Sequence, residues 1–150
     1  MASLEEEIKQ TSFRTTQNKA IINLLFTSSF IAQKQLQLFR PYGLTIPQFN
    51  VLRILRGQYP KESTVNLLID RMLDKSSNAS RIVDKLEAKE LVTRKKNPVD
   101  RRAVDVFISE KGLEILAKLD IEIANWENKN IQLTDEESRH LNLLLDKFRG

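Results

Sequence analysis

The hydrophobic positions of the chain recur at helical spacing over most of its length. From Asn18 to Phe39 apolar side chains return every three or four residues for about six turns, which predicts one long helix. The segment from Arg40 to Gly43 ends this helix, because proline disfavours a helical residue before it and Gly43 supplies a positive φ. A second helix begins near the capping residue Thr45 and ends between Gly57 and Pro60.

Two short helices joined by a polar turn are predicted next. Ser63 or Thr64 can cap the first, whose apolar positions run as far as Met72. The second, roughly Ser77 to Lys89, is amphipathic and has small polar and basic residues near its start. This arrangement is typical of a helix-turn-helix.

The periodicity then changes from helical to alternating. One strand is predicted from Leu91 to Arg94 and a second over residues 103–108, in which Val104, Val106 and Ile108 alternate with Ala103, Asp105 and Phe107. The charged segment from Lys95 to Arg102 between them contains an Asn-Pro pair, which favours a turn. The pattern therefore predicts a β-hairpin with a basic tip, which is the wing of a winged helix-turn-helix.

Long helices are also predicted in the last third of the chain. Ser109 can cap a helix that carries apolar residues as far as Trp126, and Thr134 with Glu137 has the spacing of a capping box at the start of another. These helices and the first one carry more apolar surface than a unit of this size covers, so we expect a second copy of the chain to bury it. The predicted fold is mainly α with a small β-hairpin wing, in which residues 1–40 and 109–150 form a dimerisation domain and residues 41–108 form the winged helix-turn-helix.

The positive charge of the chain is concentrated in one segment. The 150 residues include 24 Lys and Arg against 20 Asp and Glu, for a net charge of +4. Residues 71–102 hold ten of the basic and five of the acidic residues, which is more than the whole excess. A charged run is usually a solvated face, but this one coincides with the predicted helix-turn-helix and wing and so favours a nucleic acid as the partner.

A winged helix-turn-helix places its second helix, the recognition helix, in the major groove of double-stranded DNA and its wing along the backbone toward the minor groove. Asn78 and Arg81 are the candidates for base reading, because Asn pairs with adenine and Arg with guanine through two hydrogen bonds each. Ser76, Ser77 and Lys85 are candidates for phosphate contacts, and helix capping is the alternative role of the two serines. The full candidate set is Ser76, Ser77, Asn78, Ser80, Arg81 and Lys85 on the recognition helix, and Lys95, Lys96, Arg101 and Arg102 on the wing, with Asp100 orienting a guanidinium.

The chain resembles the multiple-antibiotic-resistance regulator (MarR) family in three stretches, in order and spacing. These are Leu44 to Leu52, Ser80 to Glu87, and Asp100-Arg101-Arg102 followed by Ile108-Ser109-Glu110-Lys111-Gly112. The resemblance covers nearly the whole chain. It implies a homodimer, usually a repressor, that binds a pseudo-palindromic operator, and it places Arg102 at the wing tip and residues 76–85 on the recognition helix.

Two further expectations follow from the resemblance. Many relatives have glycine where this chain has Glu90, so Glu90 either adopts a costly left-handed conformation or lies in a different turn. Family members often release DNA when a small aromatic or anionic effector binds, and Phe26, Phe30, Tyr42 and Trp126 are the candidate pocket residues. Aromatic residues at helical spacing are more often part of the core, which is the alternative reading of these four.

No residue pattern indicates catalysis. The chain has a single histidine, His140, no cysteine, no glycine-rich phosphate loop and no metal-ligand spacing, so we expect neither an enzyme nor a metal or other cofactor. Acidic residues stand where a signal peptide needs a basic patch, and no apolar run can span a bilayer, so we expect a cytoplasmic protein without membrane contact. The alternative function is a winged-helix protein-interaction module that does not bind DNA.

Overall fold

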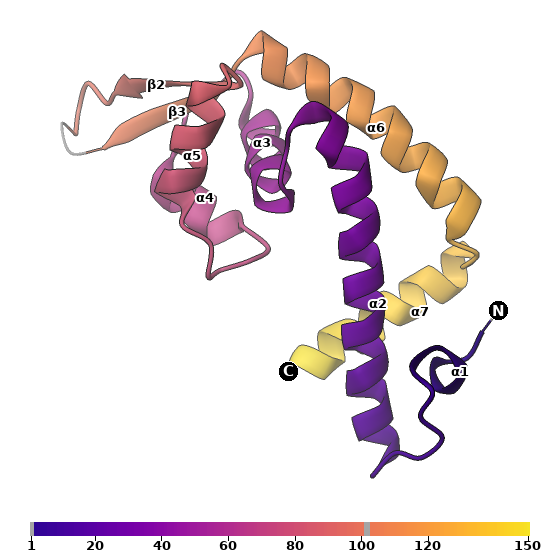
Figure 1. The fold of residues 1–150 in the computed structure, drawn as a ribbon. Helices are drawn as coiled ribbons and strands as arrows, with labels where there is room; N and C mark the ends of the chain where they lie inside the picture. The colour runs from indigo at the N-terminus through magenta and orange to yellow at the C-terminus, as the bar shows by residue number, and fades with distance from the viewer. Residues whose placement is uncertain (1, 101–102) are drawn as a thin grey trace.

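The computed structural model describes residues 2–100 and 103–150. It contains a winged unit, formed by the elements between Ile46 and Ile108, from which long helices extend (Figure 1). In Figure 1 the winged unit lies at one end, with α2 and α6 leading away from it and α7 following α6. The elements in chain order are α1 (Leu4–Ile8), α2 (Thr16–Phe39), the 3-10 helix η1 (Arg40–Tyr42), α3 (Ile46–Gln58), β1 (Ser63–Thr64), α4 (Val65–Arg71), α5 (Ala79–Ala88), β2 (Val92–Lys96), β3 (Val104–Ile108), α6 (Glu110–Asn130) and α7 (Asp135–Arg149).

Side-chain caps set the beginnings of the helices, as the sequence predicts. Thr45, Ser109 and Thr134 each accept a hydrogen bond from the backbone N–H three residues further on, at the starts of α3, α6 and α7. Of the two candidates at α4, Thr64 is the cap. Gly43 follows η1 with φ of 65°, the left-handed conformation that was expected there.

The sheet has three antiparallel strands in the order β1-β3-β2, of which β2 and β3 form the predicted hairpin. Strand β1 is not predicted, and it pairs through Ser63 opposite Val106. A strict alternation in β3 would bury Val104 and expose Asp105, but the structure shows the reverse at both positions, because Asp105 is buried and Val104 is exposed. Asp105 lies on β3, the central strand of the sheet, and its carboxylate is shielded from water. Hydrogen bonds from the Asn97 amide at 2.9 and 3.2 Å compensate for the lost hydration.

The hydrophobic core lies inside the winged unit and at its junction with α2 and α6. Val83 and Leu86 of α5 join this core, and α6 contributes Leu116 and Leu119. At the end of α2 the Phe39 ring stacks on the Phe49 ring of α3, and the two ring centroids are 4.3 Å apart. The winged unit is therefore fixed to one end of each long helix.

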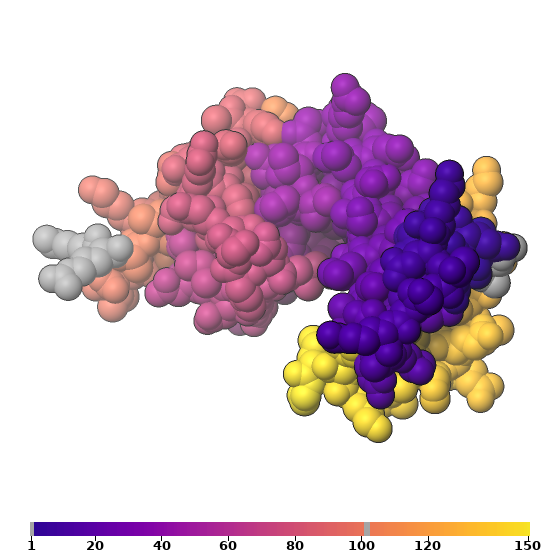
Figure 2. All heavy atoms as spheres, turned by 60° about the horizontal axis from the view of Figure 1, so that its bottom comes forward, coloured from indigo at the N-terminus to yellow at the C-terminus, as the bar shows by residue number. Residues whose placement is uncertain are grey.

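Away from this junction the long helices expose much of their apolar surface. Phe39 is the only buried residue of α2, and among the described residues α7 has none. In the space-filling view the two chain ends gather at the end of the molecule opposite the wing (Figure 2). The expected excess of apolar surface is present, and its burial by a second copy stays a prediction. None of the described helices is long and apolar enough to cross a membrane.

Candidate nucleic-acid interface

Helix α5 is the predicted recognition helix, and its apolar and polar residues lie on different faces. Val83 and Leu86 are buried in the core, whereas Ser80, Arg81 and Lys85 are exposed. Because the buried residues anchor one side of the helix, the exposed residues are held outward on a fixed surface.

The start of α5 is set by Asn78 and not by the serines before it. The Asn78 Oδ1 accepts the backbone N–H of Arg81 at 3.0 Å, so the helix begins directly after Asn78, later than predicted. Ser76 and Ser77 instead donate their hydroxyls to the Asp74 carboxylate at 2.6 and 2.9 Å, and the hydroxyl of Ser76 contributes most to lowering the pKa of Asp74. The alternative role of the serines, capping of this helix, is therefore wrong, because they fix the preceding turn.

A hollow of about 360 Å³ lies between α5 and the N-terminal end of α3. Within the described part of the chain, the side chains of Arg81 and Lys85 have no hydrogen bond or ion pair to another residue. Both cations are therefore available to an external partner. The residues that line the hollow are Thr45, Pro47, Gln48, Ser77, Asn78, Arg81, Ile82 and Lys85.

The first turn of α3 borders this hollow with a capping box. The Thr45 Oγ1 accepts the Gln48 N–H at 3.3 Å, and the Gln48 Oε1 accepts the Thr45 N–H at 3.2 Å. The capping box uses the N–H groups of Thr45 and Gln48, and the partial positive charge of this helix end adds to the attraction of Arg81 and Lys85 for an anion. Gln48 is not among the predicted site residues, although the Thr-x-x-Gln spacing is the signal that identifies it.

The base of the wing is organised by Asn97. Its Oδ1 accepts the backbone N–H groups of Val99 and Asp100 at 2.9 and 2.8 Å, while its amide donates to the buried Asp105. One side chain therefore ties the turn to the central strand. Of the four predicted wing cations, Lys95 lies 5.4 Å from the centroid of the Phe107 ring, and Lys96 is exposed.

Arg101 and Arg102 lie outside the described residues, and so does the expected role of Asp100 toward them. The backbone of Asp100 takes part in the turn, since its carbonyl accepts the Ala103 N–H at 3.0 Å. The DNA contacts of Arg101 and Arg102 and the orienting role of Asp100 therefore stay predictions.

Arg94 of β2 connects the wing to the recognition helix, a link that the sequence does not predict. Its Nη1 donates to Asp84 Oδ1 at 2.6 Å, its Nε donates to Glu87 Oε2 at 2.8 Å, and its Nη2 also bonds Glu87. The hydrogen bond to Glu87 makes the largest contribution to raising the pKa of Arg94, and the bond to Asp84 raises it further. The signal for the link is two acids three residues apart on one helix, followed by an arginine early in the next strand.

The turn after the recognition helix adopts the first of the two conformations considered for Glu90. Its φ is 62°, which is left-handed. The Glu90 carbonyl accepts the Ser109 hydroxyl at 2.8 Å, and Lys111 Nζ donates to the Lys89 carbonyl at 3.1 Å. The start of α6 thus holds the strained turn in place.

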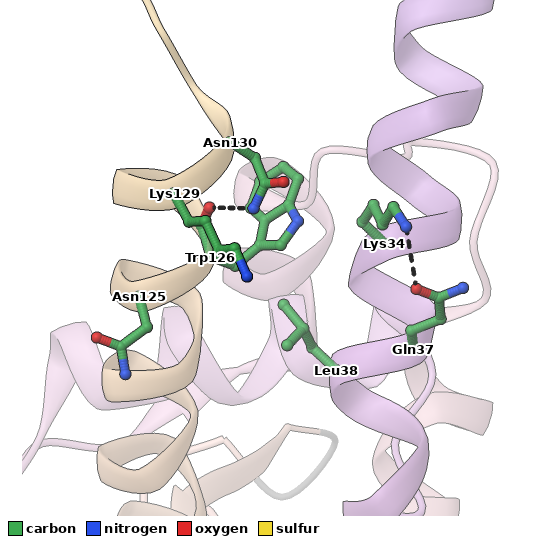
Figure 3. Close-up of a pocket in the computed structure, with 7 residues that line it drawn as sticks. All are labelled: Lys34, Gln37, Leu38, Asn125, Trp126, Lys129 and Asn130. Atoms are coloured by element: carbon green, nitrogen blue, oxygen red, sulfur yellow. Dashed lines mark hydrogen bonds between the residues drawn. The ribbon is translucent and has the colours of Figure 1, made fainter.

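A second hollow, of about 400 Å³, lies between α2 and α6 (Figure 3). Of the four candidate pocket residues, the structure places Trp126 at this hollow. Tyr42 instead donates its hydroxyl to Glu122 of α6, which raises the pKa of Tyr42, and Phe26 and Phe30 lie exposed on α2. The lining residues are Lys34, Gln37, Leu38, Asn125, Trp126, Lys129 and Asn130.

The lining of this second hollow combines apolar and cationic groups. In Figure 3 Leu38 points from α2 toward the Trp126 indole on α6. Lys34 donates to Gln37 at 3.4 Å, and Lys129 supplies a second ammonium from α6. The described residues contain no cluster of metal-ligating side chains, and His140 is exposed on α7.

Comparison with known proteins gives consistent matches over most of the chain. A sequence profile described as the MarR family matches residues 44–104. The HTH-type transcriptional regulator MhqR of Bacillus subtilis is 31% identical over 119 residues, which are 73% of this chain and 79% of that protein.

Two solved structures share the fold at lower identity. The MepR–DNA complex from S. aureus has a TM-score of 0.73 and 21% identity, with 83% of this chain and 91% of that chain covered. An organohalide-sensing transcriptional regulator in its 2,4-dichlorophenol-bound form has a TM-score of 0.77 and 21% identity, with 99% and 88% covered. These likenesses place the winged unit and the long helices in one known architecture.

Proposed function

The chain belongs to the MarR family of transcriptional regulators, and from this premise we propose that it acts as a homodimer that binds a pseudo-palindromic operator and releases it when a small effector binds. The family consists of transcription regulators rather than enzymes. The chain is accordingly a DNA-binding regulator, and repression is the sign of regulation that we propose for it.

The observation that supports DNA binding most directly is the exposed cationic face of α5 beside the first turn of α3. Arg81 and Lys85 have no partner elsewhere in the described chain, and both line the same hollow as Thr45 and Asn78. We assign Arg81 and the exposed amide of Asn78 to base edges, and Lys85 with the α3 N-terminus to phosphates. Ser80 lies on the same face, and the wing cations Lys96, Arg101 and Arg102 complete the proposed surface.

The test of DNA binding begins with selection of bound fragments from the source genome, followed by titration of one selected fragment. We expect Arg81→Ala to weaken binding and to relax sequence preference, because arginine reads guanine through two hydrogen bonds. Lys85→Ala should weaken binding of all sequences alike and reduce the salt dependence. Lys118→Ala, an exposed lysine of α6, is the matched control and should change neither property.

A winged-helix protein-interaction module would give a different result. No genomic fragment would be retained at low salt, or binding would be indifferent to salt and to both substitutions on α5. Either result would contradict the proposed function.

We assign residues 1–40 and 109–150 to the dimerisation domain, because their helices expose apolar residues that the winged unit does not cover. Leu25 on α2 is 65% exposed, and Leu143 on α7 is 68% exposed. Sedimentation at micromolar concentration should show a dimer, and Leu25→Glu or Leu143→Glu should shift the mass toward the monomer. Leu73→Glu, at a position 78% exposed on the winged unit, should leave the mass unchanged. A wild-type monomer would remove the two-fold operator geometry.

We propose the hollow between α2 and α6 as the effector site, and its lining favours a small aromatic anion. An indole and a leucine suit an aromatic ring, while Lys34 and Lys129 suit a carboxylate. Trp126 is the only tryptophan of the chain, so its fluorescence reports the site without labelling. Benzoate should quench this fluorescence with saturation, and Lys34→Gln with Lys129→Gln should weaken the effect. Saturable release of DNA by benzoate without any change in fluorescence would place the effector elsewhere.

A further inference from the structure

The exposed face of the recognition helix carries acidic residues among its basic residues. At 100° per residue, Asp84 lies about 60° from Arg81 and about 100° from Lys85 around the helix axis, on the same exposed side. The side chain of Asp84 is 59% exposed and that of Glu87 is 38% exposed. A helix that enters the major groove brings these carboxylates toward two phosphate backbones, and like charges repel at that distance.

Arg94, which lies on β2 and not on the helix, pairs with both acidic residues. Its guanidinium bonds Asp84 at 2.6 Å through Nη1 and Glu87 at 2.8 Å through Nε, while its own side chain is 35% exposed. The planar fork of arginine can hold two carboxylates at once, which the point charge of lysine does less well. The bonds direct both carboxylates to the β2 side of the helix, so that Arg81 and Lys85 face outward without an acidic neighbour competing for them.

We propose that Arg94 is a positioning residue for DNA binding, which neutralises the acids of the recognition helix and holds them away from the duplex. The proposal rests on the proposed function, and it assigns to Arg94 a role that is not contact with DNA. It also couples the wing to the recognition helix, because the residue that shields the helix belongs to the strand that leads to the wing tip.

The test compares the wild type with Arg94→Ala on one genomic fragment selected by the wild-type protein. At about 50 mM salt we expect affinity to fall about tenfold, because two carboxylates are then unopposed near the phosphates. The deficit should shrink to about twofold near 0.5 M salt, where the Debye length is only a few ångströms. Arg94→Lys should retain part of the affinity. Arg149→Ala removes an exposed arginine from α7 and is the control for loss of one positive charge.

Removal of the acids separates shielding from a merely structural link. In the Arg94→Ala background, Asp84→Asn with Glu87→Gln should restore affinity to within about threefold of the wild type, since there is then nothing to shield. In the wild-type background the same pair should bind at least as tightly as the wild type, and this comparison is informative even if Arg94→Ala fails to fold. Weaker binding by that pair, or a deficit of folded Arg94→Ala that neither salt nor the pair relieves, would overturn the proposal. If the wild type retains no fragment, the proposed function fails instead.

Discussion

Gly112 lies in the first turn of α6, where a methyl group has no room. A Cβ at this position would lie 2.6 Å from the Leu91 carbonyl oxygen and 2.8 Å from Ile108 Cγ1. The carbonyl cannot retreat freely, because it accepts the Ser109 N–H at 3.0 Å. The substitution Gly112→Ala therefore has to move the backbone at the junction of hairpin and helix.

The magnitude follows from three contributions to the free energy of unfolding. Overpacking costs about 1–3 kcal/mol, and loss of the Ser109–Leu91 hydrogen bond costs about 1 kcal/mol more. Alanine returns about 1 kcal/mol through its higher helix propensity. We expect Gly112→Ala to destabilise the protein by about 1–3 kcal/mol, which lowers the Tm by about 3–10 °C for a chain of this size.

Gly57 in α3 is the matched control, because a Cβ there meets no atom within 4 Å. The same substitution should raise the Tm by about 1–4 °C through helix propensity alone. Thermal unfolding followed by circular dichroism checks both variants at one protomer concentration, because the Tm of a dimer depends on concentration. A Gly112→Ala protein as stable as the wild type would refute the steric argument, especially if Gly57→Ala shows the expected gain.

Four further predictions follow from single residues. Glu90→Gly should raise the free energy of unfolding by about 0.5–1 kcal/mol, measured by urea denaturation, because glycine adopts the left-handed φ without strain; a loss of stability would contradict this. Asn78→Ser should keep the cap of α5 and lose the amide that reads a base, so operator preference falls while the Tm holds, whereas Asn78→Ala should also destabilise by about 1 kcal/mol. Asn97→Ala should destabilise by about 1–3 kcal/mol in the same unfolding assay, because the buried Asp105 loses its amide donor, and unchanged stability would refute that. The pKa of Asp74 is lower in the folded protein than its usual 3.8, so its contribution to stability is present above that pH and is lost as pH falls through the folded pKa; Asp74→Asn should flatten this part of an acid titration followed by circular dichroism.

Local patterns in the sequence predict most of the helices and the β-hairpin, while long-range pairings account for what they miss. Caps and periodicity locate α3, α6 and α7, because these signals lie within a few residues of each helix start. Strand β1 has only two residues, too few to show alternation, and it exists because β3 offers a free edge. The burial of Asp105 depends on a hydrogen bond from the Asn97 amide, eight residues earlier in the chain. A pattern of alternating residues does not contain this information.

The candidate site is predicted in the same uneven way. The exposed residues of α5 follow from one amphipathic helix, so Arg81 and Lys85 are found directly. The roles of Ser76 and Ser77 are not, because Asp74 competes for their hydroxyls within a turn whose geometry the sequence does not give. The second hollow likewise depends on the distance between α2 and α6, and only Trp126 among its lining residues is predicted.

The basic segment of the sequence divides into two populations once its partners are known. Lys75 and Lys89 donate to backbone carbonyls, at Ile69 and at Gly43, and Arg94 opposes acids on α5. These cations have internal partners, so they would have to break those bonds before they could contact a phosphate directly. A cation that neutralises a phosphate contributes about 0.9 per contact to the salt dependence of binding, whereas Arg94 affects it only through the acids that it opposes. The count of positive charges in residues 71–102 therefore overestimates the DNA surface, which rests on cations whose charge the folded chain leaves unopposed.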